Sequence, residues 1–207
     1  MNDGFLGLIG LWFLLLFLWI GLFDRFFAEN NWNKKWVIII LVFELLFTGW
    51  TIELPGNGQI AVMSALLPLC LGGWLWVKLG DNSRLHLLTA SFLVGASVFL
   101  MQLLLRLDPV LMFMQESYMI ASFALVLILV AARTPVQQFV LLTLGLVLGD
   151  ICYQAYLWEK TGHYLLGSPL HRDTWWIALY LLILARLILQ YAKRSSAWKR
   201  KRAETTS

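Results

Sequence analysis

The stretch FLGLIGLWFLLLFLWIGLF, Phe5 to Phe23, carries no charged residue and is long enough to cross a bilayer as a single helix. The hydrocarbon core of a membrane is roughly 30 Å thick, and an α-helix rises about 1.5 Å per residue. The stretch lacks the basic segment that opens a signal peptide, Asp3 stands in front of it, and no small-residue cleavage site follows it. We therefore expect it to be a retained first membrane span.

The composition of the whole chain supports the same class of protein. The 207 residues are 60% hydrophobic and only 14% charged, with a mean hydropathy of +0.74, whereas an ordinary soluble domain is about 25% charged. These values predict an integral membrane protein. Cys70 and Cys152 lie inside apolar runs, so we expect buried hydrophobic side chains there and neither a disulfide framework nor a thiolate metal site.

Six more apolar runs follow the first one, and short segments with proline or glycine, such as ELPGNG and RLDP, separate them. The predicted fold is an all-α, polytopic transmembrane helix bundle. Residues 1–192 would form a single transmembrane domain, and residues 193–207 a basic cytoplasmic tail. The seven spans are predicted at residues 5–23, 36–52, 59–77, 85–105, 110–132, 136–157 and 174–192.

Lysine and arginine are unevenly distributed between the two sides of these spans. One side carries Arg106, Lys160 and Arg172. The other side carries many more: Arg25, Lys34, Lys35, Lys78, Arg84, Arg133, Lys193, Arg194, Lys199, Arg200, Lys201 and Arg202. Because basic connections stay in the cytoplasm, we expect the N-terminus outside and the C-terminus inside. The basic tail is expected to contact anionic lipid headgroups; a nucleic-acid patch is the less favoured alternative.

Two oppositely charged residues are predicted to meet inside the membrane. A charged side chain within a span is costly unless it faces another polar group or a water-filled cavity. Counted from the predicted span ends, Glu44 and Arg186 lie at comparable depth on the inner side. The sequence therefore predicts a buried ion pair, which would serve either as structural neutralisation or as a gate or counter-ion.

Two carboxylates are predicted at matched depth on the outer side. Glu116 and Asp150 lie on consecutive spans that a short connection joins. Two such acids close together would share a proton, or a cation or a basic partner would lie between them. In the alternative, the acids are protonated and form hydrogen bonds between helices.

Other polar residues gather at this predicted level and favour an outward-facing polar cavity, which would hold a small ligand or a proton. The closest to the two acids are Gln102, Tyr153 and Gln154 in the predicted spans and Arg106 just above Gln102 in the outer connection. Further polar residues on the same side are Glu53, Gln59, His163, Tyr164, His171, Arg172 and Asp173. The GxxxG motif of Gly145 and Gly149 and the small residues of 89–97 predict close helix packing beside Asp150.

The sequence carries no recognised motif of enzymatic chemistry. The chain contains no HExxH, GxSxG, P-loop or nucleotide-binding fingerprint. His163 and His171 are separated by irregular chain, and no third ligand accompanies them. We therefore expect no catalytic residue, no metal, no cofactor and no enzymatic activity.

The stretch HRDTWW, which begins at His171, and the RLDP turn resemble the YphA family of small multi-span membrane proteins of Gram-positive, spore-forming bacteria. The resemblance covers most of the chain. It implies a multi-pass protein of the bacterial plasma membrane, and it carries over no activity and no site residue.

Two functions remain open at this point. The favoured one is a membrane protein that binds or moves a small solute or a proton through the polar cavity. The alternative is a non-catalytic accessory or assembly protein of the cell envelope. An intramembrane enzyme acting on lipid would need a nucleophile with a base, or a metal cluster, and the sequence contains neither pattern.

Overall fold

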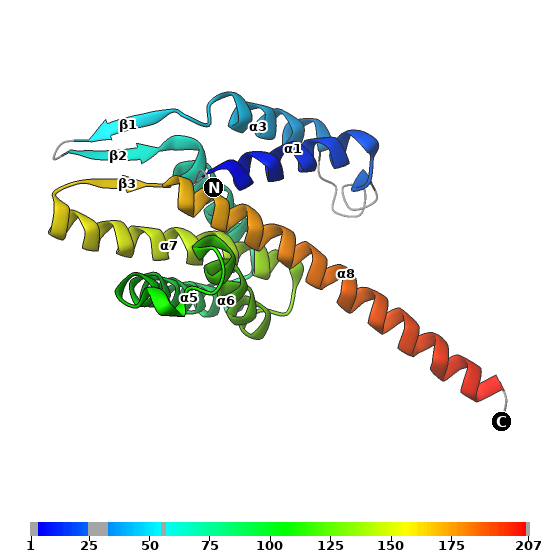
Figure 1. The fold of residues 1–207 in the computed structure, drawn as a ribbon. Coiled ribbons are helices and arrows are strands. Elements are labelled where there is room, and N and C mark those ends of the chain that lie inside the picture. The colour runs from blue at the N-terminus through cyan, green and yellow to red at the C-terminus, as the bar shows by residue number, and fades with distance from the viewer. Residues whose placement is uncertain (1–3, 25–32, 55–56, 206–207) are drawn as a thin grey trace.

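The computed structural model describes residues 4–24, 33–54 and 57–205, and their side chains except those of residues 81–83, 190 and 192–205. Within these residues the chain is all-α, as predicted, apart from one small sheet. The α-helices are α1 (Phe5–Ile20), α3 (Lys34–Leu46), α4 (Leu67–Lys78), α5 (Asp81–Leu107), α6 (Glu116–Ala131), α7 (Pro135–Thr161) and α8 (Pro169–Thr205) (Figure 1).

Each predicted span coincides with one of these helices, but several bounds differ. α3 ends at Leu46, well before the predicted end at 52, and α6 begins at Glu116 rather than at 110. A short 3-10 helix, η2 (Pro109–Leu111), precedes α6, and the Asp108 side chain accepts the Val110 N–H at its start. Among the described residues, 84–107 and 135–161 form helices long and apolar enough to cross a bilayer; the helices over 5–20, 62–78 and 116–131 are apolar but shorter.

A small sheet, absent from the sequence prediction, replaces the ends of two predicted spans. Its strands are β1 (Thr51–Leu54), β2 (Gly58–Ala61) and β3 (Tyr164–Leu166); β1 and β2 are antiparallel, and β3 runs parallel to β2. A π-helical turn, η1 (Val62–Leu66), joins β2 to α4. The spans predicted at 36–52 and 59–77 therefore overrun into strand, because a short apolar run does not by itself distinguish a strand from the end of a helix.

The glycine pattern of α7 explains how closely α5 packs against it. A Cβ atom built on Gly145 would lie 2.7 Å from Cγ1 of Val94, and one built on Gly149 would lie 2.8 Å from Cγ1 of Val98 and 3.1 Å from the Gly95 carbonyl oxygen. Such distances leave no room for a side chain. The predicted close packing at the GxxxG motif is confirmed, and its partner is the run of small residues in α5.

The start of α8 holds the start of α1. Both carboxylate oxygens of Asp173 accept backbone N–H groups of α1, from Gly4 at 2.7 Å and from Gly7 at 2.6 Å. Arg172 donates to the Gly4 carbonyl oxygen at 2.7 Å, and the Tyr180 hydroxyl donates to that of Gly10 at 2.5 Å. The first N–H groups of a helix have no partner within it, so Asp173 caps α1 from the other end of the chain. We call this arrangement the α1–α8 clasp.

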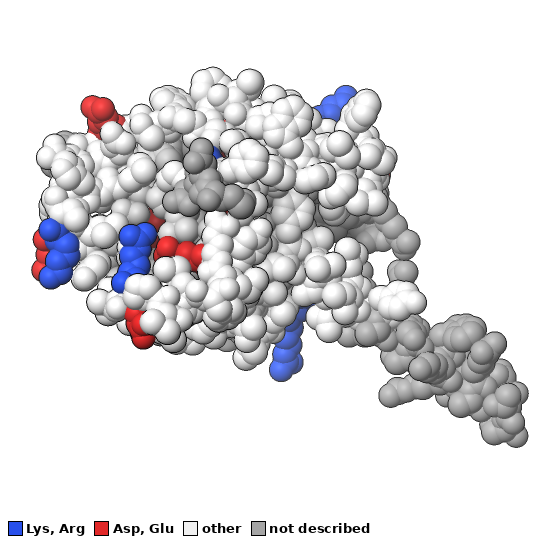
Figure 2. Space-filling view, viewed as in Figure 1, with Lys and Arg blue, Asp and Glu red and all other residues white. Residues whose placement is uncertain are grey.

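The sheet marks one end of the bundle, called here the sheet end. β1, β2 and β3 lie beside the C-terminal end of α7, whereas α8 starts near the sheet and its C-terminal part projects beyond the other helices (Figure 1). On the face drawn in Figure 2, charged side chains are few and most of the surface is uncharged. Large apolar side chains are exposed on α1, α3, α5 and α8, for example Trp19, Trp36 and Leu93.

Candidate functional site

A cavity opens at the sheet end. Its volume is about 500 Å³, within the range of small-molecule sites. Helices α5, α7 and α8, strands β2 and β3 and the turn before β2 contribute to its wall. The lining residues are Asn57, Gln59, Arg106, Tyr153, Gln154, Leu157, His163, Tyr164, Leu165, Ser168, Pro169 and Leu170. We call it the polar cavity.

Three of the six predicted ligand-site residues, Arg106, Tyr153 and Gln154, line the polar cavity. Arg106 extends from the last turn of α5, with its guanidinium carbon 5.4 Å from the centre of the Tyr153 ring. A fourth predicted residue, Glu116, lies at the start of α6, with its Oε1 3.8 Å from Nε of Arg106. The fold therefore brings Arg106, Glu116 and Tyr153 close together, as predicted for the polar region.

The fifth predicted residue, Gln102, lies beneath this group. Val94 packs on Gly145 and Val98 on Gly149, and one further turn along both helices brings Gln102 and Tyr153 to the same level. Both are almost fully buried, at 3% and 4% exposure. The Gln102 Oε1 and the Tyr153 hydroxyl have no hydrogen-bond partner among the described residues. Buried polar atoms of this kind usually bind water or a ligand.

Asp150, the sixth, does not belong to the polar cavity. Its Oδ2 accepts the N–H of Gly167 at 2.7 Å, and the Ser64 hydroxyl donates to the Gly167 carbonyl oxygen at 2.7 Å. Gln154, one turn further along α7, accepts the Leu165 N–H at 3.1 Å. Asp150 thus stabilises the turn between β3 and α8, which explains the presence of an acid within this apolar helix.

The prediction that Glu116 and Asp150 form a matched pair of acids is wrong. Asp150 is bonded to Gly167 and Glu116 lies beside Arg106, and among the described residues no hydrogen bond joins the two carboxyl groups. Glu116 was expected well inside a span that starts at 110, but it is the first residue of α6. Sequence depth also does not fix the rotation of a helix about its axis. Asp150 faces the β3–α8 turn, whereas Tyr153, three residues later, faces Arg106.

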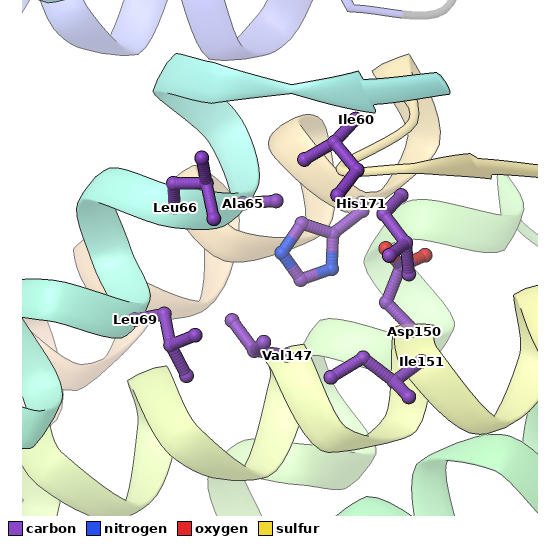
Figure 3. A pocket seen from close by; sticks show the side chains of 9 residues that line it. Ile60, Ala65, Leu66, Leu69, Val147, Asp150, Ile151 and His171 are labelled. Carbon is purple, nitrogen blue, oxygen red and sulfur yellow. The ribbon is translucent and has the colours of Figure 1, made fainter. Parts of the chain in front are cut away.

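A second, smaller pocket adjoins Asp150. It has a volume of about 50 Å³, enough for one or two water molecules. Figure 3 shows the His171 ring in it, with Asp150 and Ile151 on one side and Ala65 and Leu66 on the other. Nε2 of His171 has no hydrogen-bond partner among the described residues. His171 and His163, which lines the polar cavity, therefore occupy different pockets.

The predicted ion pair between Glu44 and Arg186 is also wrong. Nε of Arg186 donates to Oε1 of Gln138 at 2.5 Å, and its NH2 group donates to the Arg133 carbonyl oxygen at 2.7 Å. Glu44 instead hydrogen-bonds with the Trp176 side chain. Trp176 and Arg186 are ten residues apart on α8, so they are separated by about 15 Å along the helix.

The error in Glu44 has a simple origin. Its depth was counted from the start of the predicted span at 36, on the assumption that all spans begin and end at the same membrane levels. α3 is instead short, and Glu44 lies in its last turn, near residues at the start of α8. There it approaches Arg172, which interacts with it electrostatically. Glu44 is therefore a neighbour of the α1–α8 clasp, at the opposite end of α8 from the partners of Arg186.

Part of the cavity wall was not predicted from sequence. Gln59, His163 and Tyr164 were recognised as polar residues of this side, but Asn57, Ser168 and the apolar floor of Leu157, Leu165, Pro169 and Leu170 were not. The glycine and proline residues around Asn57 and Ser168 were a signal for turns, and turns at the end of a bundle commonly carry binding residues. The predicted lipid-binding residues from Lys193 to Arg202 fall outside the described side chains.

The comparisons with known proteins agree with this all-α, apolar architecture. Among curated proteins and among solved structures, none matches the chain. A family model described as YphA-like integral membrane protein matches residues 7–207, which include the HRDTWW and RLDP motifs. The chain therefore belongs to the family of YphA-like integral membrane proteins.

Proposed function

We propose that this protein is a multi-pass protein of the bacterial plasma membrane that binds a small solute in the polar cavity and catalyses no reaction. The observation that carries the proposal is the cavity of about 500 Å³ with Arg106, Tyr153, Gln154 and His163 in its wall. Convergent polar groups in a concave site are typical of ligand binding. The unpartnered Tyr153 hydroxyl supports the same function, because a solute can supply its missing hydrogen bond.

The proposed topology has seven crossings, with the N-terminus outside and the cavity open to the exterior. It is supported by the uneven distribution of Lys and Arg in the sequence. The helices that are too short to cross alone, such as α3, continue into strands or turns at the sheet end. Irregular backbone at membrane depth is tolerated where protein or water covers it. The basic C-terminal tail is proposed to contact anionic lipid.

Solute binding is tested by thermal unfolding of the purified protein in detergent. A bound solute stabilises the folded state by about 2.7 kcal/mol at a concentration 100 times its Kd. We expect at least one member of a panel of small anions, cations and neutral polar solutes to raise the unfolding temperature of the wild-type protein. Leu157→Trp, which fills the cavity, should abolish the increase. Leu93→Trp, an equal change on an exposed face of α5, should not.

A second candidate function is that of a non-catalytic accessory protein of the cell envelope. It is favoured by the structural role of Asp150 and Asp173, because both carboxylates accept backbone N–H groups and stabilise the fold. If no solute in the panel stabilises the wild-type protein, solute binding is overturned and this function takes its place.

A further inference from the structure

The polar cavity has an uneven charge. Arg106 carries a positive charge, and no Asp or Glu is among the described residues that line the cavity. The other polar groups in the wall are neutral amides, hydroxyls and the His163 imidazole. Two carboxylates lie next to lining residues: Glu116 is beside Arg106, and Glu53 is paired with Gln59 across strands β1 and β2. Among the described lining residues, the one permanently charged side chain is therefore that of Arg106, and it is positive.

The Arg106 guanidinium keeps its hydrogen-bond donors available. It donates no hydrogen bond to any residue that the structure describes. The 3.8 Å between Nε and the Glu116 carboxylate is beyond hydrogen-bond length. The Tyr153 ring lies near the guanidinium carbon at 5.4 Å. A guanidinium has five N–H donors in a planar fork, which fits the two oxygens of a carboxylate or a phosphate.

The apolar lining residues indicate what the uncharged part of the ligand would be. Leu157, Leu165, Pro169 and Leu170 give the lining apolar surface, and Tyr164 adds an aromatic ring to it. A bare inorganic ion would leave most of about 500 Å³ empty. The cavity therefore suits a molecule with an oxyanion at one end and a small organic body.

We infer that the solute is an organic oxyanion, a carboxylate or a phosphate monoester, whose charged group binds Arg106. This assignment rests on the proposed solute-binding function and names its ligand class. The same chemistry is present in a free small molecule and in the headgroup of an anionic lipid. Glu116 competes with the ligand for Arg106, because its carboxylate lies beside the same guanidinium.

The test compares solutes that differ in charge and little in shape. Butyrate, benzoate and glycerol 3-phosphate are compared with butyramide, benzamide and glycerol by thermal unfolding and by calorimetric titration in detergent. A separate arm compares nanodiscs of phosphatidylglycerol with nanodiscs of phosphatidylcholine. We expect at least one anion to bind and its neutral counterpart to bind at least about tenfold more weakly. Stabilisation by phosphatidylglycerol alone would identify the lipid headgroup as the source.

Four variants separate Arg106 from the net charge of the protein. Arg106→Gln should weaken anion binding at least about tenfold, and Arg106→Lys should weaken it less, because lysine keeps the charge but not the fork. Glu116→Gln should tighten binding several-fold by removing the competing charge. Lys160→Gln, which removes a positive charge from a residue outside the lining, should leave binding unchanged. Arg106 is half exposed, so the unliganded variants should unfold near the wild-type temperature.

Two outcomes overturn the inference, and they are distinguishable. If neutral or cationic solutes bind and the anions do not, the ligand class is wrong and solute binding stands. If neither the solutes nor the anionic lipid bind, solute binding itself is overturned. Anion binding that Arg106→Gln and Lys160→Gln weaken equally would show a response to net charge alone and would also remove Arg106 from the site.

Discussion

At the scale of single residues, Gly167 shows how polar backbone is accommodated in this apolar molecule. Its N–H is bound by Asp150 of α7 and its carbonyl oxygen by Ser64 of η1. Its φ of 73° lies in the left-handed region, which glycine adopts at little cost. The turn between β3 and α8 is therefore held by side chains from two other elements.

The first prediction concerns Asp150. Asp150→Ala leaves the buried Gly167 N–H without an acceptor, so we expect the free energy of unfolding in detergent to fall by about 1–3 kcal/mol. Asp150→Asn keeps an oxygen at the same place and should cost less than about 1 kcal/mol. Equal losses for the two variants would show that the negative charge, and not the hydrogen bond to Gly167, is what stabilises the fold.

The second prediction compares two glycines with the same backbone conformation. Gly162 and Gly167 both have φ of 73°, but a Cβ on Gly167 would lie 2.9 Å from the Ala65 backbone nitrogen, whereas nothing lies within 4 Å at Gly162. Gly162→Ala should therefore cost roughly 1–2 kcal/mol, the strain of the left-handed conformation alone. Gly167→Ala should cost about 1–3 kcal/mol more, from overpacking. Chemical denaturation in detergent measures both, and similar losses would contradict the close approach.

At the scale of secondary-structure elements, the contact of α5 with α7 depends on paired small and branched residues. The third prediction is a double-mutant cycle at one pair. Gly145→Ala pushes a methyl group toward the Val94 side chain and should destabilise the protein by about 1–3 kcal/mol. Val94→Ala opens that space, so the double variant should be more stable than the sum of the single losses predicts, by about 0.5–3 kcal/mol.

The control for this cycle is Gly95. A Cβ there would lie 3.1 Å from the Gly145 carbonyl oxygen and 3.2 Å from the Gly149 nitrogen, which are backbone atoms. Val94→Ala should therefore not rescue Gly95→Ala. A rescue of both variants would mean that the helices simply move apart, and the specific contact between Gly145 and Val94 would be disproved.

Element types were accessible from the sequence, whereas helix ends and helix rotations were not. Long apolar runs predicted a helix at every span, and the GxxxG motif predicted the tight contact of α7. The end of α3 at Leu46 could not be predicted, because the residues up to 52 can form either the end of a helix or the start of a strand. Glu44 was placed beside Arg186 because both depths were counted from one assumed inner membrane level, whereas Glu44 lies near Arg172.

The sequence predicted which residues lie near the polar cavity but not which of them face it. Depth along a span follows from counting residues, and it correctly assigned Arg106, Tyr153 and Gln154 to one polar region. The direction of a side chain around the helix depends on packing with neighbours, which no single sequence motif specifies. Asp150 therefore faces the β3–α8 turn, on a different side of α7 from Tyr153.

At the scale of the whole molecule, exposed apolar surface is the main feature. Trp19 is 86% exposed and Val130 82%, values that are expected where an integral membrane protein meets lipid. Cys70 and Cys152, expected to be buried, are exposed as well. A hydrophobic environment suits a cysteine side chain whether protein or lipid provides it. The sequence indicated an apolar environment for both cysteines, but it did not indicate whether protein or lipid provides that environment.

The fourth prediction is the orientation of the bundle, with Met1 outside and Ser207 inside. Its reason is the excess of Lys and Arg on the side that includes the tail. An alkaline phosphatase fused after Ser207 should be inactive, because that enzyme matures only outside the cytoplasm, and a fluorescent protein fused at the same position should be bright. The reverse pattern would overturn the orientation and would place the polar cavity on the cytoplasmic side.

The α1–α8 clasp also has a consequence for biogenesis. Gly4 and Asp173 are separated by 169 positions, and at a synthesis rate of about 5–20 residues per second this corresponds to roughly 10–30 s between the appearance of the two. During that interval the amide groups at the start of α1 lack the carboxylate that later caps them. A nascent chain that stops before Asp173 would release a bundle whose first helix stays uncapped. Synthesis of the first turns of α8 is thus the step that allows the clasp to form.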